Sequence, residues 1–422
     1  MNNVADLVDP ILTPLESIDV SDPRIYENDA WRPYFARLRE QAPVHYQANS
    51  PFGPFWSITR FNDIVAVDTN HEVFSSEPTV ILGDLTEDLP ITQFISMDPP
   101  KHDVQRRAVQ SVVAPQNLSD MEGLIRSRVI EILDALPVGE TFNWVDRVSI
   151  NLTTQMLATL FDFPFEQREK LTFWSDIAGA TPELTGGDTP PEERLAAMHD
   201  CLATFTALWH ERKAQGGQAM DLISLLQRDP NTADMVDRPM EYLGNIILLI
   251  IGGNDTTRNS ASGGVVALNQ NPAEYDKLRA NPDLIPGMVP EIIRWQTPLM
   301  HMRRTAKSDI EFEGKLIKKG DKVVMWYLSG NRDESVIEKA DEFIIDRKNP
   351  RHHIAFGFGV HRCMGNRLAE MQLRVLWEEI MVRFDSVEMV GEPTRVKSNF
   401  VRGYSDLPVR VHPRKGCNSD KN

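Results

Sequence analysis

Apolar side chains recur with a helical period over much of this chain. In these stretches apolar residues lie three or four positions apart, the spacing that places them on one face of an α-helix. The stretches span residues 120–136, 151–160, 195–213, 239–268, 290–295 and 366–384. The pattern predicts that the protein is mainly α-helical.

Shorter segments alternate apolar and polar residues between glycines and prolines, which is typical of β-strands. They lie at residues 44–46, 55–59, 310–312 and 322–327. We therefore expect small β-sheets beside the helices. Because no Ser/Gly-rich or Pro-rich spacer divides the chain, residues 1–422 are predicted to form a single domain, with residues 413–422 as a polar, disordered tail.

A segment rich in glycine and proline separates two helical patterns at residues 178–194. It carries two adjacent glycines and three prolines, so it is predicted to be a loop that connects helices. One interpretation is a mobile lid over a buried cavity, and the other is an ordinary surface loop. The sequence leaves both open.

Composition and charge exclude several classes of function. The net charge of −16 argues against nucleic acid as a partner, because phosphate binding needs a basic face. The three cysteines, Cys201, Cys363 and Cys417, are far apart, which fits a reducing compartment and predicts a cytoplasmic protein. The N-terminus lacks a signal-peptide pattern, and no apolar run is long enough to span a bilayer, so we expect no membrane anchor.

The most informative segment is Phe-Gly-Phe-Gly-Val-His-Arg-Cys-Met-Gly at residues 356–365, directly before a helical pattern. Its glycines permit tight turns and close approach of the backbone to a flat ligand. Free amides at the loop and helix start favour a thiolate over a thiol, which predicts a low pKa for Cys363. Cys201 and Cys417 have no such surroundings and are interpreted as a buried thiol and an exposed thiol.

These ten residues resemble the cysteine-ligand signature of the cytochrome P450 family. The resemblance implies that Cys363 binds the iron of a haem b (iron protoporphyrin IX), where a thiolate ligand favours cleavage of dioxygen. It also implies the family's fold, with the haem buried between a long distal helix and the helix after the cysteine loop. The expected function is that of a monooxygenase.

An apolar helix at residues 246–257 is interrupted by two glycines, an acid and two hydroxyls. Taken alone, Asp255 and Thr256 could be a polar face or a kink. The stretch is similar to the family's oxygen-binding segment at Gly252, Gly253, Asp255 and Thr256. This similarity implies that Thr256 supports dioxygen activation by hydrogen bonding and that Asp255 relays protons from water.

Cations that could hold the two haem propionates occur at three separate places. His102 and Arg106 lie four residues apart, so they share one helix face, which would otherwise be an ordinary solvated basic face. The resemblance implies that they bind the propionates together with Arg304 and His361.

Glu291 and Arg294 lie one helical turn apart and match the family's Glu-x-x-Arg pattern, with Arg347 as its distal arginine. The resemblance implies a buried ion-pair network that is structural rather than chemical.

The substrate pocket is predicted to be apolar. Leu248, Ile251 and Gly252 precede the acid–alcohol pair at helical spacing, and Leu299 and Met300 align with the family's loop over the haem. Weaker candidates, any of which could be ordinary core, are Ile81, Leu82, Ile91, Phe94 and Phe400.

The stretches at residues 252–260 and 301–306 look like the bacterial branch that hydroxylates medium-chain alkanes and fatty acids at the terminal carbon. Hydroxylation of a terpenoid or small aromatic substrate is the alternative within the class. A peroxygenase or a non-catalytic haem sensor is the alternative outside it, and the presence of both Asp255 and Thr256 argues against these two.

No flavin or ferredoxin domain is expected after the cysteine helix, so electrons must come from outside. The family's soluble bacterial members imply an iron–sulfur ferredoxin and its NAD(P)H-dependent flavin reductase. Arg107, Arg126 and Arg362 are candidate docking cations, and a plain surface role fits them equally well.

Overall fold

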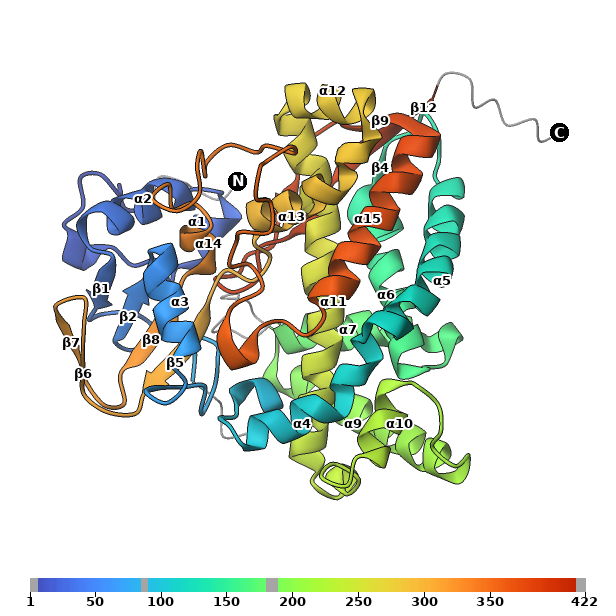
Figure 1. The fold of residues 1–422 in the computed structure, drawn as a ribbon, viewed down its shortest axis with the longest axis horizontal. Coiled ribbons are helices and arrows are strands. Elements are labelled where there is room, and N and C mark those ends of the chain that lie inside the picture. The colour runs from blue at the N-terminus through green and yellow to red at the C-terminus, as the bar shows by residue number, and fades with distance from the viewer. Residues whose placement is uncertain (1–6, 85–89, 180–188, 415–422) are drawn as a thin grey trace.

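The protein is described here by a computed structural model, in which residues 7–84, 90–179 and 189–414 are placed. Helices dominate, with the largest sheet at the left of the view and a second small sheet at the upper right (Figure 1). The helices are α1 (Pro23–Glu27), α2 (Trp31–Gln41), α3 (Phe61–Thr69), α4 (Lys101–Gln110), α5 (Pro115–Asp134), α6 (Asn151–Phe161), α7 (Glu169–Gly179), α9 (Pro191–Ala214), α10 (Leu222–Arg228), α11 (Pro239–Gln270), α12 (Pro272–Ala280), α13 (Ile285–Gln296), α14 (Tyr327–Gly330) and α15 (Asn366–Arg383). The predicted fold class, mainly helical with small sheets, is confirmed.

The largest sheet has the strand order β1-β2-β8-β5-β3, with β2 and β8 parallel and the other neighbours antiparallel. A second sheet has the order β4-β12-β9, and two hairpin-like pairs are β6-β7 and β10-β11. The strands are β1 (Val44–Gln47), β2 (Phe55–Ile58), β3 (Phe74–Ser75), β4 (Phe142–Asn143), β5 (Met302–Ala306), β6 (Ile310–Phe312), β7 (Lys315–Ile317), β8 (Lys322–Met325), β9 (Phe384–Met389), β10 (Thr394–Arg395), β11 (Tyr404–Asp406) and β12 (Pro408–Pro413).

Helix α11 runs through the middle of the helical part, with α15 in front of it in the view of Figure 1. It begins at Pro239, whose fixed φ suits the first position of a helix. Buried residues occur on every side of it, as expected of a helix enclosed by others. It packs against α6, α7, α9, α13 and α15. This central position places one face of α11 opposite the loop that precedes α15.

Several predicted boundaries are wrong, each for a local reason. Helix α13 begins at Ile285, not at residue 290, because Pro290 is accommodated inside the helix rather than at its start. Residues 191–194, assigned to a loop, form the first turn of α9, which Pro191 initiates. Strand β8 ends at Met325, and the chain turns into α14 at Tyr327.

The ends of the predicted loop and tail are only partly described. Residues 180–188 of the expected lid lie outside the described residues, and so do residues 415–422 of the expected tail. Pro413, which was assigned to the tail, pairs with Phe384 in the sheet of β12 and β9. Within the described residues no helix combines the length and the apolar character needed to cross a bilayer.

Candidate active site

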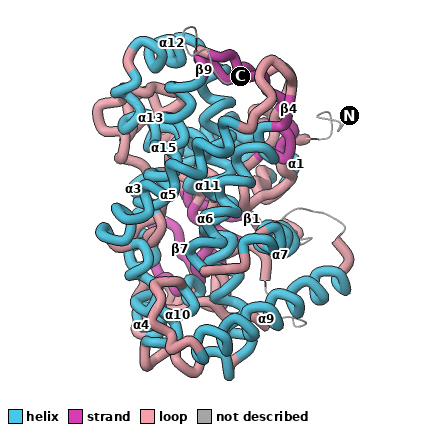
Figure 2. Tube along the Cα trace, turned by 90° about the vertical axis from the view of Figure 1, so that its right-hand side faces the viewer, coloured by secondary structure: helices cyan, strands magenta, loops and turns pink. Residues whose placement is uncertain are grey.

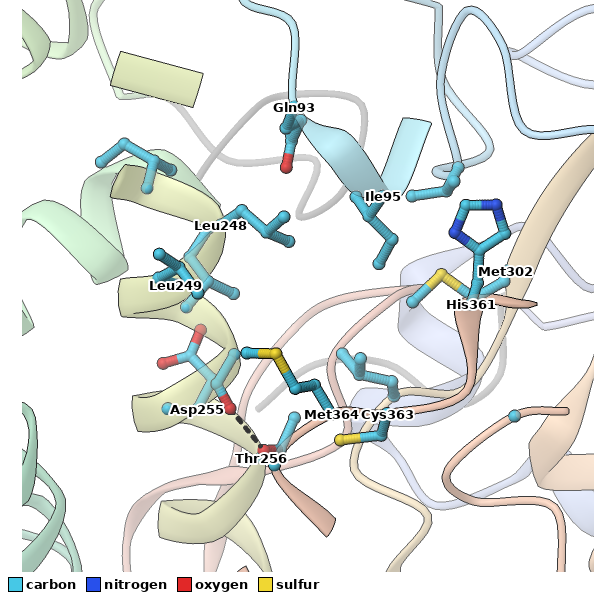
Figure 3. A pocket seen from close by; sticks show the side chains of 18 of the residues that line it. Gln93, Ile95, Leu248, Leu249, Asp255, Thr256, Met302, His361, Cys363 and Met364 are labelled. Carbon is cyan, nitrogen blue, oxygen red and sulfur yellow. Dashed lines mark hydrogen bonds between the residues drawn. The ribbon is translucent and has the colours of Figure 1, made fainter. Parts of the chain in front are cut away.

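A cavity of about 370 Å³ lies between α11 and the loop before α15. Its walls also include segments before α4, the start of α9, and residues on either side of β5. Most of the lining is apolar, but it also includes Arg106, Arg304 and His361. Cys363 and Thr256 both reach this cavity from opposing elements (Figure 3).

Cys363 lies in the loop that leads into α15. Its backbone amide donates a hydrogen bond to the Phe356 carbonyl oxygen at 2.8 Å, which closes the loop. The side chain is exposed where it faces the cavity. Burial raises the pKa of the thiol, while the backbone amides of Gly365 and Asn366 and the charge of Arg106 act in the opposite direction.

The expected low pKa of Cys363 is therefore wrong for the protein alone, because desolvation outweighs the amides and cations. The prediction that the loop glycines permit tight turns holds at two positions. Gly357 and Gly359 have φ of +65° and +67°, a conformation that side chains rarely adopt. A Cβ on Gly359 would also lie 2.6 Å from the Asp68 carbonyl oxygen, so the loop passes α3 at backbone contact distance.

Thr256 lies on the face of α11 that lines the cavity. Its hydroxyl donates a hydrogen bond to the Gly252 carbonyl oxygen at 3.0 Å, one helical turn back. A Cβ on Gly252 would meet no protein atom within 4 Å, whereas one on Gly253 would lie 2.7 Å from Leu157 Cδ2. The two glycines thus have different uses: Gly252 leaves space in the cavity, and Gly253 lets α6 pack closely.

Asp255 is buried, and its carboxylate points away from Cys363 in Figure 3. One of its oxygens accepts a hydrogen bond from the Ser175 hydroxyl at 3.1 Å and an ion pair from Arg258 at 3.0 Å. Arg258 also pairs with Asp176 at 2.9 Å. Burial raises the pKa of Asp255, and the nearby Arg258 reduces that rise without cancelling it.

Two histidines meet beside the cavity. The rings of His102 and His361 lie 4.2 Å apart between centroids, where His102 bonds to Asp103 and His361 bonds to Ser76. Each ring keeps one buried nitrogen, Nε2 of His102 and Nδ1 of His361, without a partner in the described part of the chain. Burial lowers the pKa of His361 to about 2 and also lowers that of His102.

Two arginines complete this cluster. Arg106 donates to the Arg362 carbonyl oxygen, and Arg304 donates to Asp68 at 2.6 Å; both arginines line the cavity. Buried polar atoms without partners are rare in folded proteins and call for a hydrogen-bond partner. Three of the expected anchors, Arg106, Arg304 and His361, line the cavity, whereas His102 lies behind them against the ring of His361. This cluster of donors fits the carboxylates of a haem.

Asp68 was missed by the sequence analysis. It is 2% exposed, and its carboxylate accepts hydrogen bonds from Arg304, from the Tyr327 hydroxyl at 2.9 Å and from the Phe358 amide at 2.8 Å. It thereby ties an expected haem anchor to the cysteine loop. No motif surrounds Asp68 in the sequence, so only the fold shows this connection.

Glu291, Arg294 and Arg347 form a network away from the cavity. Arg294 donates to both oxygens of Glu291 at 2.7 and 2.8 Å, and Arg347 donates to the same two oxygens at 3.0 and 3.2 Å. Glu291 and Arg294 are fully buried. Arg294 further donates to the backbone carbonyls of Asn331, Ala340 and Glu342, which fixes the segment before the cysteine loop.

The apolar walls agree with the expected residues except at two positions. Leu248, Ile251, Gly252 and Leu299 line the cavity. Met300 does not, because successive residues of an extended segment point to opposite sides, and it packs in a cluster with Trp326. Of the weaker candidates, those that line the cavity are Ile81, Ile91, Phe94 and Phe400. Leu82 packs with Met300 instead, and Met302, which was not expected, lines the cavity.

The candidate docking cations differ in availability. Arg107 and Arg362 are exposed at the side of the cysteine loop and α4. Arg126 is engaged by Glu122, Glu378 and Glu379, and these contacts raise its pKa further above the ordinary arginine value. Arg126 is therefore a poor candidate for docking a partner.

Comparison with known proteins gives consistent matches. The family description "Cytochrome P450" matches residues 193–403. The chain is 35% identical to the linalool 8-monooxygenase of Pseudomonas putida, over 95% of this chain and 100% of that protein. It is 30% identical to the methyl-branched lipid omega-hydroxylase of Mycobacterium bovis, over 94% of this chain and 96% of that protein.

This chain is also similar to a solved structure over nearly the whole length of both chains. It is the cytochrome P450-153 from Novosphingobium aromaticivorans, which is 43% identical, with a TM-score of 0.87 and coverage of 93% of this chain and 99% of that chain.

Proposed function

This chain belongs to the cytochrome P450 family and is a haem-thiolate monooxygenase, and we propose that it hydroxylates medium-chain alkanes or fatty acids at the terminal carbon. One oxygen atom of O2 enters a C–H bond of the substrate, and the other leaves as water with electrons and protons from outside. The observation that supports this substrate class is the apolar lining of the cavity beside Cys363.

The haem would supply the binding and cleavage of dioxygen. We assign haem b, because the residues present offer one cysteine ligand and noncovalent anchors. Cys363 would bind the iron, and the propionates would accept hydrogen bonds from His102, Arg106, Arg304 and His361. The partnerless nitrogens of the two histidines support this assignment.

The wall of the cavity formed by α11 would control the delivery of protons to the reacting atoms. Thr256 places a hydroxyl on the cavity side of α11, where it can hold a hydrogen bond next to the reacting atoms. Asp255 lies behind it with a carboxylate tied to Ser175 and Arg258, so it would pass protons from the α7 side of the molecule. Glu291, Arg294 and Arg347 would stabilise the fold and take no part in the reaction.

The position of oxidation depends on the shape of the apolar walls. A terminal methyl has strong C–H bonds, so selectivity for it needs a channel that presents the end of the chain. Leu248 and Ile251 line the cavity from α11, and Leu299 lines it from the segment before β5. The similar omega-hydroxylase, whose name describes oxidation at a chain end, supports this proposal.

A terpenoid alcohol is the second candidate, because the linalool 8-monooxygenase is a similar protein over its whole length. Both candidates would use the same apolar walls. They differ in shape, since a terpenoid is branched and a medium-length chain is straight.

A family member of this kind needs a redox partner. We propose an iron–sulfur ferredoxin with an NAD(P)H-dependent flavin reductase, docking where Arg107 and Arg362 are exposed. We also propose a cytoplasmic location, on the wide spacing of the three cysteines.

Optical titration of the purified ferric protein tests the substrate class. Straight-chain alkanes and fatty acids of graded length are compared with linalool. We expect saturating spin-state shifts with an optimum of chain length and weak shifts with linalool. Saturation by linalool alone would replace the straight-chain proposal with the terpenoid one, whereas product analysis of the best ligand fixes the position of oxidation.

A further inference from the structure

Two of the polar side chains that line the cavity away from the histidine cluster have no side-chain partner in the described part of the protein. They are Gln93, before α4, and Arg194, in the first turn of α9. Gln93 points into the cavity from the end away from Cys363 (Figure 3). Neither belongs to a motif of the family resemblance or to the expected haem cluster.

Arg194 differs from the other arginines of the lining. Arg106 and Arg304 are held by the Arg362 carbonyl oxygen and by Asp68, beside the two histidines. Arg194 is half-buried and comes from α9, which packs on α7, α10 and α11 (Figure 2). Its chain neighbour Glu193 forms no ion pair with it, since consecutive residues of a helix do not face each other.

A guanidinium without a counter-charge among the described residues, beside a mostly apolar cavity, favours an anionic ligand. Its forked donors match a carboxylate, and the interaction is stronger where water is displaced. The net charge of −16 would otherwise repel an anion, so a local cation is needed for a carboxylate to enter. The Gln93 amide can donate an additional hydrogen bond.

We propose that Arg194, with Gln93, binds the carboxylate of a straight-chain fatty acid and so directs its methyl end toward Cys363. This inference rests on the proposed function and narrows its substrate class from alkanes and fatty acids to fatty acids. The wall that α11 contributes runs from Ile247 to Ser260, roughly 20 Å of helix, which suits an extended chain.

The test compares dodecanoate with dodecane, which have the same chain length and differ in the carboxylate. Dissociation constants are measured by calorimetry and by the haem optical shift, on wild-type holoprotein and on Arg194→Leu, Arg194→Lys and Gln93→Leu. Lys213→Leu is the matched control, because Lys213 lies on the same helix, is exposed and does not line the cavity.

We expect Arg194→Leu to weaken dodecanoate binding about tenfold or more, since hydrogen bonds to charged groups contribute at that level. Arg194→Lys should weaken dodecanoate binding less than Arg194→Leu does, and Gln93→Leu should weaken it a few-fold. Dodecane binding should stay unchanged in all variants, and Lys213→Leu should bind both ligands like wild type.

Equal dodecanoate affinity in wild type and Arg194→Leu would overturn the inference, and so would an equal loss for dodecane, which would show a packing role. If wild type binds dodecane but not dodecanoate, the inference fails while the straight-chain proposal stands. If wild type binds linalool and neither straight-chain ligand, both fail.

Discussion

Arg258 pairs with Asp255 at 3.0 Å, three residues further along α11, and the carboxylate is turned away from the cysteine loop. The acid is thus not a free group in the cavity beside Thr256. Arg258 also pairs with Asp176 of α7, so Asp255 is linked to the neighbouring helix. Any transfer of protons through Asp255 must proceed with this ion pair in place or broken.

The first prediction concerns that ion pair. Burial raises the pKa of Asp255 and Arg258 opposes the rise, so Arg258→Gln should raise the pKa further. If ionised Asp255 accepts protons from water, the acid limb of the rate profile must then move to higher pH. The measurement is product formation against pH, with Arg258→Lys as the variant that keeps the charge. An unchanged acid limb together with an unchanged solvent isotope effect would remove Asp255 from the proton path.

The second prediction concerns the Thr256 hydroxyl. Thr256→Ala removes the group that bonds to Gly252 at 3.0 Å, without an expected change in the fold. We expect several-fold more peroxide per electron consumed, because dioxygen chemistry would lose a hydrogen bond next to the reacting atoms. Peroxide and product are measured against NAD(P)H oxidation, and Thr256→Ser should restore most of the coupling. Unchanged coupling in Thr256→Ala would argue against the role.

The third prediction concerns the buried network. Glu291→Ala leaves the fully buried Arg294 without its carboxylate, which typically costs about 3 to 5 kcal/mol of folding free energy. We expect loss of haem retention and a lower urea midpoint. Glu388→Ala is the control, because the ion pair of Glu388 with His412 is exposed and should contribute less than about 1 kcal/mol. A normal yield of Glu291→Ala holoprotein would contradict the structural role.

The same network predicts a pH dependence of stability. Burial raises the pKa of Glu291, but the hydrogen bonds and charges of Arg294 and Arg347 outweigh it and hold the pKa below its ordinary value of 4.5. The unfolded chain therefore binds the proton first, so this stabilisation is present above pH 4.5 and is lost as pH falls through the folded pKa. Urea unfolding should be measured for wild type and Glu291→Gln across this pH range. The free energy of unfolding should fall more steeply with decreasing pH in wild type than in Glu291→Gln.

The fourth prediction separates the two adjacent glycines of α11. A methyl at position 252 meets no protein atom, whereas one at position 253 would lie 2.7 Å from Leu157. Gly253→Ala should therefore lower the folding free energy by about 1 to 3 kcal/mol through overpacking. Gly252→Ala should fold like wild type and instead narrow the cavity, which weakens the binding of bulky ligands. Thermal unfolding and ligand titration of both variants check this, and equal destabilisation of the two would contradict it.

How far the sequence could predict the site depends on the kind of residue. Cys363, Thr256 and the pair Glu291–Arg294 lie in short local patterns, and the resemblance of these patterns to the family's motifs gave their expected roles. Such patterns depend on backbone geometry over a few residues, and the sequence contains that information. The same reasoning placed α11 within two residues of its observed end, because apolar residues recur along it at helical spacing.

Residues brought together from distant segments were not accessible in this way. Asp68 reaches Arg304 and the cysteine loop only because α3 packs against that loop, and Arg194 and Gln93 meet one cavity from separate elements. Met300 was placed in the cavity wall with Leu299 because the stretch aligns with the family's loop over the haem, but adjacent residues of an extended segment face opposite sides.

The sequence by itself therefore determined the mainly helical fold class, the iron-binding cysteine loop as a hypothesis, and the apolar character of the cavity. Tertiary structure alone decided which side chains line that cavity, which cations are already paired, and in which direction Asp255 points. The physical reason is that helix period and loop glycines act over a few residues. Burial, ion pairing and pKa depend on neighbours that only packing brings within a few ångströms.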